Sequence, residues 1–170
     1  MIPDAYYKDI YTIDYDKLKR TGIKNIFFDV DNTIITYEEN IPSKELVDFI
    51  NKLKKEFNIE VISNSKSKRV LKIINKLEIS GYYFSMKPLK KNYKKIMKKY
   101  KKEECIFIGD QFMTDVIGAK RNDLKIILVD RISKNEPLFT RFWRFFEKKK
   151  VNKLNKNNKF CWYKYYDNIV

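Results

Sequence analysis

The stretch that most constrains the fold is a short apolar run that ends in two carboxylates. Ile26, Phe27 and Phe28 have high strand preference and show no polar alternation, which is typical of a strand buried on both faces of a parallel sheet. Asp29 and Asp31 follow, and in an extended backbone residues two apart point the same way. Converging carboxylates repel each other, and a hard divalent cation such as Mg²⁺ is the usual solution. Asp is also common in turns, so the pair taken alone equally fits a strand that simply ends.

Strands and helices alternate along the chain, which predicts βαβ units around a parallel sheet. Apolar runs predict strands at residues 24–30, 59–63, 82–84, 105–108 and 126–129. Apolar residues at a 3.6-residue period predict helices at residues 43–57, 70–77, 93–100 and 114–122. Residues 1–22 are expected to form an irregular lead-in. Ligands of such sheets bind beyond the carboxyl ends of the strands, where Asp29, Asp31, Ser63, Lys87 and Asp110 are predicted to lie.

Composition narrows the chemistry that this edge of the sheet can perform. The chain has 170 residues, 44% of them hydrophobic, which suits a single core. It has no histidine, which excludes histidine bases, nucleophiles and metal ligands. The net charge of +15 favours polyanionic partners such as nucleic acid, anionic lipid or phosphorylated ligands, although ordinary solvated surface also accounts for it. Two cysteines without a motif, and no signal peptide or long apolar run, predict a cytoplasmic protein.

The strand-end residues have the chemistry of a phosphoryl-transfer site. Asp29 could attack phosphorus, and Asp31 could protonate the leaving group and later deprotonate a water molecule. Asp110 offers a further oxygen, so the candidate metal ligands are Asp29, Asp31 and Asp110. The hydroxyl of Ser63 could bind phosphate oxygens, and Lys87 would offset the negative charge of the transition state. The supporting residue is Asp115, which could orient Lys87 or bind a metal-bound water molecule.

Four motifs, in order, resemble those of the haloacid dehalogenase (HAD) superfamily phosphatases. Residues 29–33 look like the first motif, DxDxT, and residues 109–115 look like the fourth, GDxxxxD. Ser63 and Lys87 match the second and third. The resemblance implies a HAD-like Rossmannoid three-layer sandwich and Mg²⁺-dependent hydrolysis of a phosphomonoester through an aspartyl-phosphate. It also places Thr33 and Asn64, with Ser63 and Lys87, among the substrate-binding residues.

Further details resemble the YqeG-type group of subfamily IIIA, which includes mitochondrial phosphatidylglycerophosphate phosphatases. The similarity runs over residues 3–154 and departs at residues 155–170. The intervals between the motifs are too short for a cap domain, so a substrate on a macromolecule or a membrane is expected. The resemblance implies phosphatidylglycerophosphate as the substrate. Nucleic-acid end phosphates are an alternative, as is a non-catalytic module that binds nucleic acid or the ribosome.

The C-terminal part is expected to be a basic, aromatic tail, residues 151–170, beyond one domain at residues 1–150. Before it, an amphipathic helix is predicted at residues 138–146. One face is apolar (Leu138, Phe139, Phe142, Trp143, Phe145, Phe146), and the other is polar (Thr140, Arg141, Arg144, Glu147, Lys148). The apolar face fits packing in the core, a dimer interface or peripheral contact with an anionic membrane. Residues 152–159 are expected to be mobile, and the aromatic segment 160–166 is expected to dock.

Overall fold

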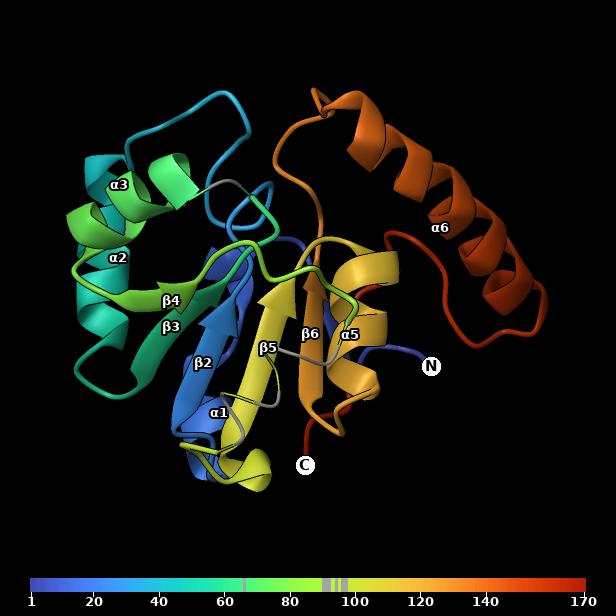
Figure 1. Ribbon diagram of the computed structural model, residues 1–170. Helices are drawn as coiled ribbons and strands as arrows, with labels where there is room; N and C mark the ends of the chain where they lie inside the picture. The colour runs from blue at the N-terminus through green and yellow to red at the C-terminus, as the bar shows by residue number, and fades with distance from the viewer. Residues whose placement is uncertain (66, 90–92, 94, 96–97) are drawn as a thin grey trace.

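The computed structural model describes residues 1–65, 67–89, 93, 95 and 98–170. Its centre is a seven-stranded sheet with the strand order β4-β3-β2-β5-β6-β1-β7 (Figure 1). The pairs from β4 to β1 are parallel, and β7 adds an antiparallel edge strand beside β1. Helices flank the sheet (Figure 1). The predicted α/β fold with a central parallel sheet is therefore confirmed.

The strands place alternate side chains in two separate cores. Their bounds are β1 Ala5–Tyr7, β2 Asn25–Phe28, β3 Asn58–Ile62, β4 Ser80–Tyr82, β5 Cys105–Gly109, β6 Lys125–Val129 and β7 Tyr166–Asp167. In β2, Ile26 and Phe28 belong to one hydrophobic cluster and Phe27 belongs to the other. Because both faces of β2 are covered, the strand is apolar without alternation, as the sequence indicated.

The helices lie where the 3.6-residue period predicts them, with differences at their ends. The α-helices are α1 Tyr15–Arg20, α2 Lys44–Leu53, α3 Ser67–Leu77, α5 Ile117–Lys120 and α6 Leu138–Lys156. The described residues also form two short 3₁₀ turns, η1 Ile10–Thr12 and η2 Lys102–Glu104, and one π-helical turn, η3 Phe112–Val116. The side chain of Ser43 caps α2 by accepting from the N–H of Leu46 at 3.2 Å. The helix predicted at residues 93–100 falls largely outside the described residues.

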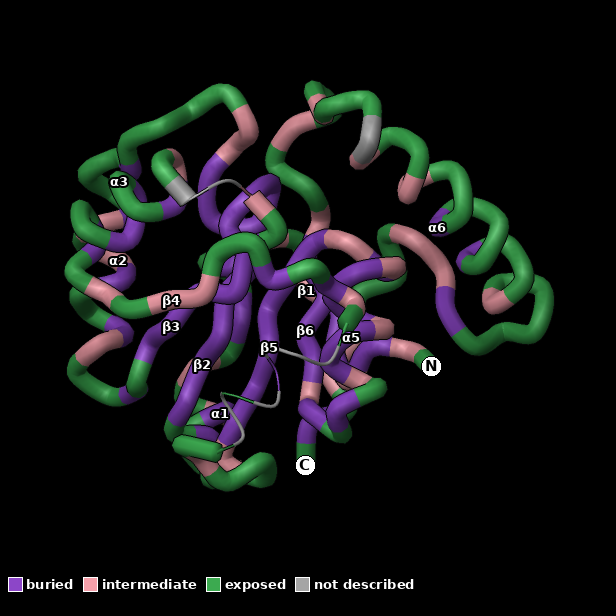
Figure 2. Tube along the Cα trace, viewed as in Figure 1, coloured by how far each residue is buried: buried purple, intermediate pink, exposed green. Residues whose placement is uncertain are grey.

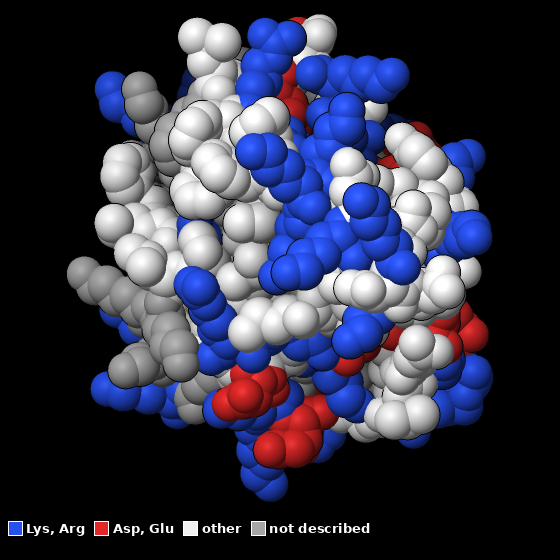
Figure 3. All heavy atoms as spheres, turned by 90° about the vertical axis from the view of Figure 1, so that its right-hand side faces the viewer, with Lys and Arg blue, Asp and Glu red and all other residues white. Residues whose placement is uncertain are grey.

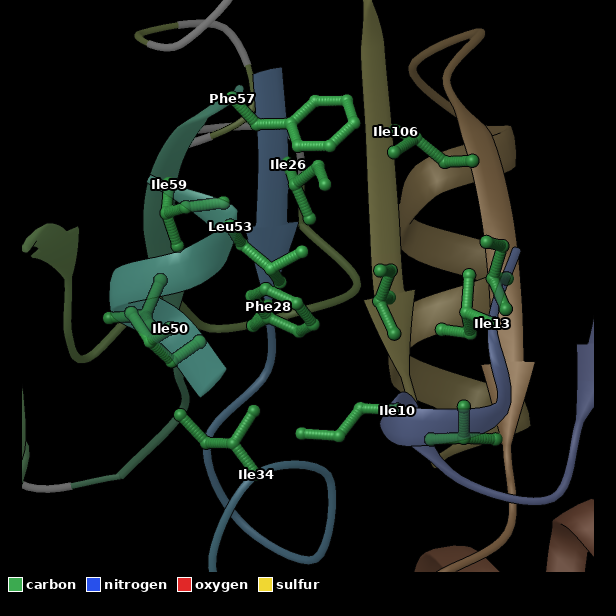
Figure 4. Close-up of a cluster of buried hydrophobic side chains, with 14 of the residues drawn as sticks. Ile10, Ile13, Ile26, Phe28, Ile34, Ile50, Leu53, Phe57, Ile59 and Ile106 are labelled. Carbon is green, nitrogen blue, oxygen red and sulfur yellow. The ribbon is translucent and has the colours of Figure 1, made fainter. Parts of the chain in front are cut away.

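The face of the sheet under α2 holds the first core (Figure 4). Ile50 and Leu53 of α2 lie over Phe28 of β2 and Ile59 of β3 in this cluster. Figure 2 shows the strands buried almost throughout, whereas the helices are exposed on their outer sides. Burial of each such side chain stabilises the fold by about 1.5–3 kcal/mol. This core fixes the strands whose carboxyl ends carry the candidate site.

The lead-in at residues 1–22 was expected to be irregular, and this prediction is wrong. Ala5–Tyr7 forms β1 inside the sheet, between β6 and β7, and α1 follows with Asp14 as its cap. Tyr6 is fully buried, and its hydroxyl donates to Asp130. A strand this short is too brief to show a period, so only its pairing with distant β6 identifies it.

The strand predicted at residues 82–84 lies two residues earlier, at Ser80–Tyr82. Gly81 lies in the middle of β4 and pairs with Val61 of β3. A Cβ atom at Gly81 would lie 2.3 Å from Cγ2 of Val61. Glycine is therefore required here by the close approach of two strands. The preceding helix, α3, ends at Leu77, where it was predicted to end.

The C-terminal aromatic segment docks on the domain, as expected. Phe160 is buried, and its ring centroid lies 5.4 Å from those of Tyr6 and Trp162. Residues 152–156, which were expected to be mobile, belong to α6, and β7 places Tyr166 and Asp167 on the sheet edge. The division into a domain at residues 1–150 and a tail at residues 151–170 stays a prediction.

Candidate active site

The motif residues gather at the carboxyl edge of four adjacent strands. Asp29 follows β2, Ser63 follows β3 and Asp110 follows β5, and these strands are neighbours in the sheet. Lys87 lies in the loop beyond β4, the next strand outward. All four side chains are buried, with relative exposures of at most 7%. The sheet order therefore brings together residues that lie far apart in the sequence.

An acidic cluster forms the centre of the site. One carboxylate oxygen each from Asp29, Asp110 and Asp115 lies within 4.8 Å of the other two. The ammonium of Lys87 contacts Asp29 Oδ1 and Asp115 Oδ1, both at 2.7 Å. One lysine thus serves two of the three carboxylates, and the expected support of Lys87 by Asp115 has the geometry of a buried ion pair.

The position of Asp115 depends on a glycine and on the turn that follows β5. A Cβ atom at Gly109 would lie 2.5 Å from Oδ2 of Asp115, so only glycine leaves room for this carboxylate. The backbone N–H of Gln111 donates to Asp115 Oδ2 at 2.9 Å. The GDxxxxD motif therefore reflects a tight turn in which η3 carries the second Asp back to the strand end.

Burial sets the charge balance of the cluster. It raises the pKa of Asp29 well above its usual range, with Lys87 opposing and the neighbouring carboxylates adding to the rise. It also raises the pKa of Asp110 to about 6, although Arg144 opposes it. Burial disfavours the ammonium of Lys87, but Asp115 and Asp29 outweigh this and raise its pKa. Asp29 and Asp110 are therefore short of nearby positive charge, whereas the two carboxylate partners of Lys87 favour its ammonium form.

This donor set fits a hard divalent cation. Three buried carboxylates that converge on one point supply the oxygen ligands that Mg²⁺ prefers. Burial raises the pKa of Asp29 and that of Asp110, so a nearby cation would stabilise the ionised forms of these two groups. Such a cation would lie between Asp29, Asp110 and Asp115 and would supply a positive charge that draws a phosphate group to Asp29. The hydroxyl of Thr33 donates to Asp110 Oδ1 at 3.3 Å and helps to orient that carboxylate.

Asp31 lies beside this cluster, with its carboxylate held by other partners. Arg69 of α3 forms an ion pair with Asp31 Oδ1, and the hydroxyl of Ser65 donates to Asp31 Oδ2. Arg69 also donates to the backbone carbonyls of Thr36 and Glu39. The acidic cluster contains Asp115, and not Asp31, as its third carboxylate. The role of Asp31 as a metal ligand stays a prediction.

Ser63 and Asn64 organise the loops around Lys87. The Ser63 hydroxyl accepts from the N–H of Ser65 at 3.0 Å. The Asn64 side chain accepts from the N–H of Lys87 at 2.7 Å and donates to the carbonyl of Lys87 at 3.1 Å. Asn64 therefore fixes the backbone that presents Lys87, and its own expected contact with substrate stays a prediction.

Arg144 of α6, like Arg69 of α3, reaches the site although the sequence did not predict it there. Its guanidinium forms an ion pair with Asp110 and donates to the Asp110 carbonyl at 3.1 Å. It also pairs with Glu136 at 2.8 Å and with Glu147 at 3.0 Å. All three carboxyl groups are at most 5% exposed. The spacing of Arg144 and Glu147 on one helical face was the available signal, but it did not reveal what that face contacts.

Because Arg144 and Glu147 turn toward the domain, α6 exposes much of its aromatic face. Phe142 and Phe145 are 57% and 55% exposed, and Leu138 is 81% exposed. Figure 2 shows α6 largely exposed, and Figure 3, which views this side of the molecule, shows Lys and Arg across much of the face. Packing of this face in the core of the chain is therefore excluded for these three residues. Of the helices that the structure describes, none combines the length and apolar character that a bilayer crossing requires.

Comparisons with known proteins agree with this geometry. Residues 35–123 match the family model of the haloacid dehalogenase-like hydrolases. The chain is 30% identical to "Probable phosphatase YqeG" of Bacillus subtilis over 164 residues, which is 95% of each protein. In fold it is similar to a predicted HAD-like family hydrolase from Porphyromonas gingivalis, with a TM-score of 0.54, 16% identity, and coverage of 72% of this chain and 98% of that chain. The fold is also similar to that of the putative HAD-hydrolase YfnB from Bacillus subtilis bound to magnesium, with a TM-score of 0.53 and 14% identity. The match covers 68% of this chain and 90% of that chain.

Proposed function

Because the chain belongs to the haloacid dehalogenase-like hydrolase family and is a phosphatase, we propose that it hydrolyses phosphomonoesters with Mg²⁺ through an aspartyl-phosphate on Asp29. The observation that carries this proposal is the buried cluster of Asp29, Asp110 and Asp115 with Lys87 between two of its members. The carboxylate of Asp29 attacks phosphorus while Lys87 offsets the negative charge on the phosphoryl oxygens. The alcohol departs with a proton from Asp31, and the same group then takes a proton from the water molecule that cleaves the acyl phosphate.

Hydrolysis of an aryl phosphate should depend on added Mg²⁺. Protein treated with a chelator and then separated from it should release phosphate at a small fraction of the original rate, because three buried carboxylates without a cation repel an anionic substrate. Added Mg²⁺ should restore the rate, whereas added Na⁺ at equal ionic strength should not. Phosphate release is measured directly, and full activity in the chelated protein would contradict the metal requirement.

We further propose that the substrate is phosphatidylglycerophosphate, held in its membrane while the enzyme binds the surface. The relative YqeG supports the subgroup, and the exposed aromatic face of α6 supports the location. A second group of exposed apolar side chains lies in the loop that carries Lys87: Phe84, Met86 and Leu89. Exposed apolar groups in the two segments that border the site would enter the headgroup region, and each nearby cation adds about 1 kcal/mol of attraction to anionic lipid.

Replacement of Leu138, Phe142 and Phe145 together by Ser should weaken binding to anionic vesicles about tenfold or more, because each loses an apolar group that inserts at the interface. Co-sedimentation with vesicles measures the binding. The three side chains are exposed, so the unfolding temperature should change little. A control variant carries Ser at Leu71 and Val170, exposed apolar residues outside α6, and should bind as the wild type does. Equal binding by both variants would exclude α6 as the contact.

A substrate screen decides the class of phosphomonoester. Phosphatidylglycerophosphate in mixed vesicles, end-phosphorylated oligonucleotides and small sugar phosphates are compared at equal phosphate concentration. The proposal predicts the highest kcat/KM for the lipid. A higher value for the oligonucleotides would transfer the proposal to nucleic-acid ends, which the basic surface in Figure 3 would attract.

A further inference from the structure

Both oxygens of the Asp31 carboxylate have a donor from the segment that follows β3. Arg69 of α3 forms an ion pair with Asp31 Oδ1, and the Ser65 hydroxyl donates to Asp31 Oδ2. The side chains of Arg69 and Asp31 are 16% and 6% exposed, so water weakens this ion pair less than it would at the surface. With a donor on each oxygen, rotation of the carboxylate is restricted.

The backbone at Asp31 is fixed as well, because the chain turns back directly after it. The N–H groups of Ile34 and Ile35 donate to the carbonyl of Val30, both at 3.2 Å. The N–H of Asn32 donates to the carbonyl of Ile35 at 2.7 Å. Asp31 therefore retains mainly the freedom of its side chain, and the two donors restrict that freedom.

Arg69 is itself oriented by the loop that follows this turn. Its Nε donates to the carbonyl of Glu39 at 3.0 Å, and its Nη2 donates to the carbonyl of Thr36 at 2.5 Å. The Glu39 carboxylate accepts from the N–H and the hydroxyl of Thr36, at 3.1 and 2.8 Å, which closes the loop into a turn. The donors of a planar guanidinium point in fixed directions, so the two that are held by carbonyls set the direction of the one that reaches Asp31.

This arrangement goes beyond a structural link between α3 and the loop. The two carbonyls alone would hold an arginine for that purpose, whereas here a further donor reaches the carboxylate to which the proposed mechanism assigns both proton transfers. Each carboxylate oxygen has two lone pairs, and one donor on each leaves room for a proton. The contacts therefore fix the direction of Asp31 without blocking its chemistry.

We propose that Arg69 is a positioning residue for Asp31, with Ser65 as a second support, and that the two keep the carboxylate aimed at the oxygen that leaves or attacks phosphorus. This inference rests on the proposed function and adds the residues that make Asp31 effective in both half-reactions. In the first, Asp29 attacks phosphorus, the bond from phosphorus to the substrate oxygen breaks, and the proton of Asp31 passes to that oxygen. In the second, water attacks phosphorus and gives a proton to Asp31, and the electron pair of the breaking bond returns to the carboxylate of Asp29.

The test measures the two half-reactions separately, by rapid quench and intact-mass detection of the phosphoenzyme in buffer with Mg²⁺. The 4-nitrophenolate ion leaves without a proton, so Arg69→Met should form the phosphoenzyme from 4-nitrophenyl phosphate within about threefold of the wild-type rate. Hydrolysis of the phosphoenzyme needs Asp31 as a base and should slow about 10–100-fold, because a misdirected carboxylate loses part of what acid–base catalysis supplies. The phosphoenzyme should therefore accumulate in this variant.

Three further variants accompany Arg69→Met. Lys72→Met is the matched control, since it removes one positive charge from an exposed position of α3, and it should keep both rates. Arg69→Lys keeps the charge but cannot reach the two carbonyls and Asp31 together, so an intermediate loss is expected. Ser65→Ala removes one donor and leaves the ion pair in place, so it should slow hydrolysis in the same direction, and it still gives a test if Arg69→Met does not fold.

The deciding measurement repeats Arg69→Met in the Asp31→Asn background. A positioning residue has no base left to position there, so hydrolysis of the phosphoenzyme should slow by less than about twofold further. An equal loss in both backgrounds would show a general effect on the fold and would overturn the inference, as would unchanged hydrolysis in both Arg69→Met and Ser65→Ala. If the wild type forms no phosphoenzyme, or if Asp31→Asn hydrolyses it at the wild-type rate, the proposed function fails and this inference fails with it.

Discussion

Asp29→Asn should abolish turnover of an aryl phosphate while the protein stays folded. The amide is a poor nucleophile toward phosphorus, so we expect kcat to fall by about 10³-fold or more, which is about 4 kcal/mol of transition-state stabilisation. The substitution removes a buried carboxylate whose ionised form burial disfavours, and Lys87 keeps Asp115 as its partner at 2.7 Å. Phosphate release and the unfolding temperature are the two measurements.

Asp31→Asn is the matched control, because it changes the neighbouring carboxylate in the same way. An aryl leaving group needs no proton, so this variant should still form the phosphoenzyme and should hydrolyse it slowly, with a loss of about 10²–10⁴-fold in turnover. Acid quench followed by intact-mass measurement should show phosphoenzyme in Asp31→Asn and none in Asp29→Asn. Phosphoenzyme in Asp29→Asn would assign the nucleophile to another residue.

Arg144→Met should destabilise the fold by about 3–5 kcal/mol, since it leaves three buried carboxyl groups without their shared cation. Burial already raises the pKa of Glu147 to about 7 and that of Asp110 to about 6 while Arg144 opposes the rise. Loss of the guanidinium removes this opposition and the anchor of α6 over the site. Denaturant unfolding measures the change in stability.

Two further variants separate anchoring from a general loss of charge. Arg144→Lys keeps the charge but cannot donate to Asp110, Glu136 and Glu147 at once, so an intermediate loss is expected. Adding Glu147→Gln to Arg144→Met should recover part of the stability, because one uncompensated carboxylate is removed.

The half-saturating Mg²⁺ concentration should rise in Arg144→Met, since Asp110 loses a contact that orients it. If Arg144→Met lowers the free energy of unfolding by less than about 1 kcal/mol, the ion pairs of Arg144 contribute no more than ordinary surface ion pairs do.

The sequence could predict the strands that carry the site because their signals are local. The run from Ile26 to Phe28 is apolar without alternation, and a parallel strand covered on both faces has that composition wherever it occurs. Asp29 and Asp110 follow such runs directly, so the rule that ligands bind beyond the carboxyl ends of parallel strands places both at one edge. The short strand β1 carries no comparable signal and was missed for that reason.

The composition of α6 likewise showed two faces, but the sequence alone could not assign them. A helix with an aromatic face is normally expected to bury it, but here Arg144 and Glu147 face the domain and Leu138, Phe142 and Phe145 are exposed. The reason is a set of partners that are distant in sequence or lie before the helix: Asp110 at the end of β5 and Glu136 in the preceding loop both need the cation of Arg144. Their buried carboxyl groups attract the polar face, and the aromatic face is left outside.

What the sequence by itself determined is the alternation of strands and helices, the strand-end positions of Asp29, Ser63 and Asp110, and the phosphoryl-transfer chemistry that these residue types allow. Only the tertiary structure decided that Asp115 completes the acidic cluster and that Arg69 and Arg144 reach the site. Periodicity and strand ends are properties of neighbouring residues, whereas each of these contacts joins segments that come together only when the sheet order is set.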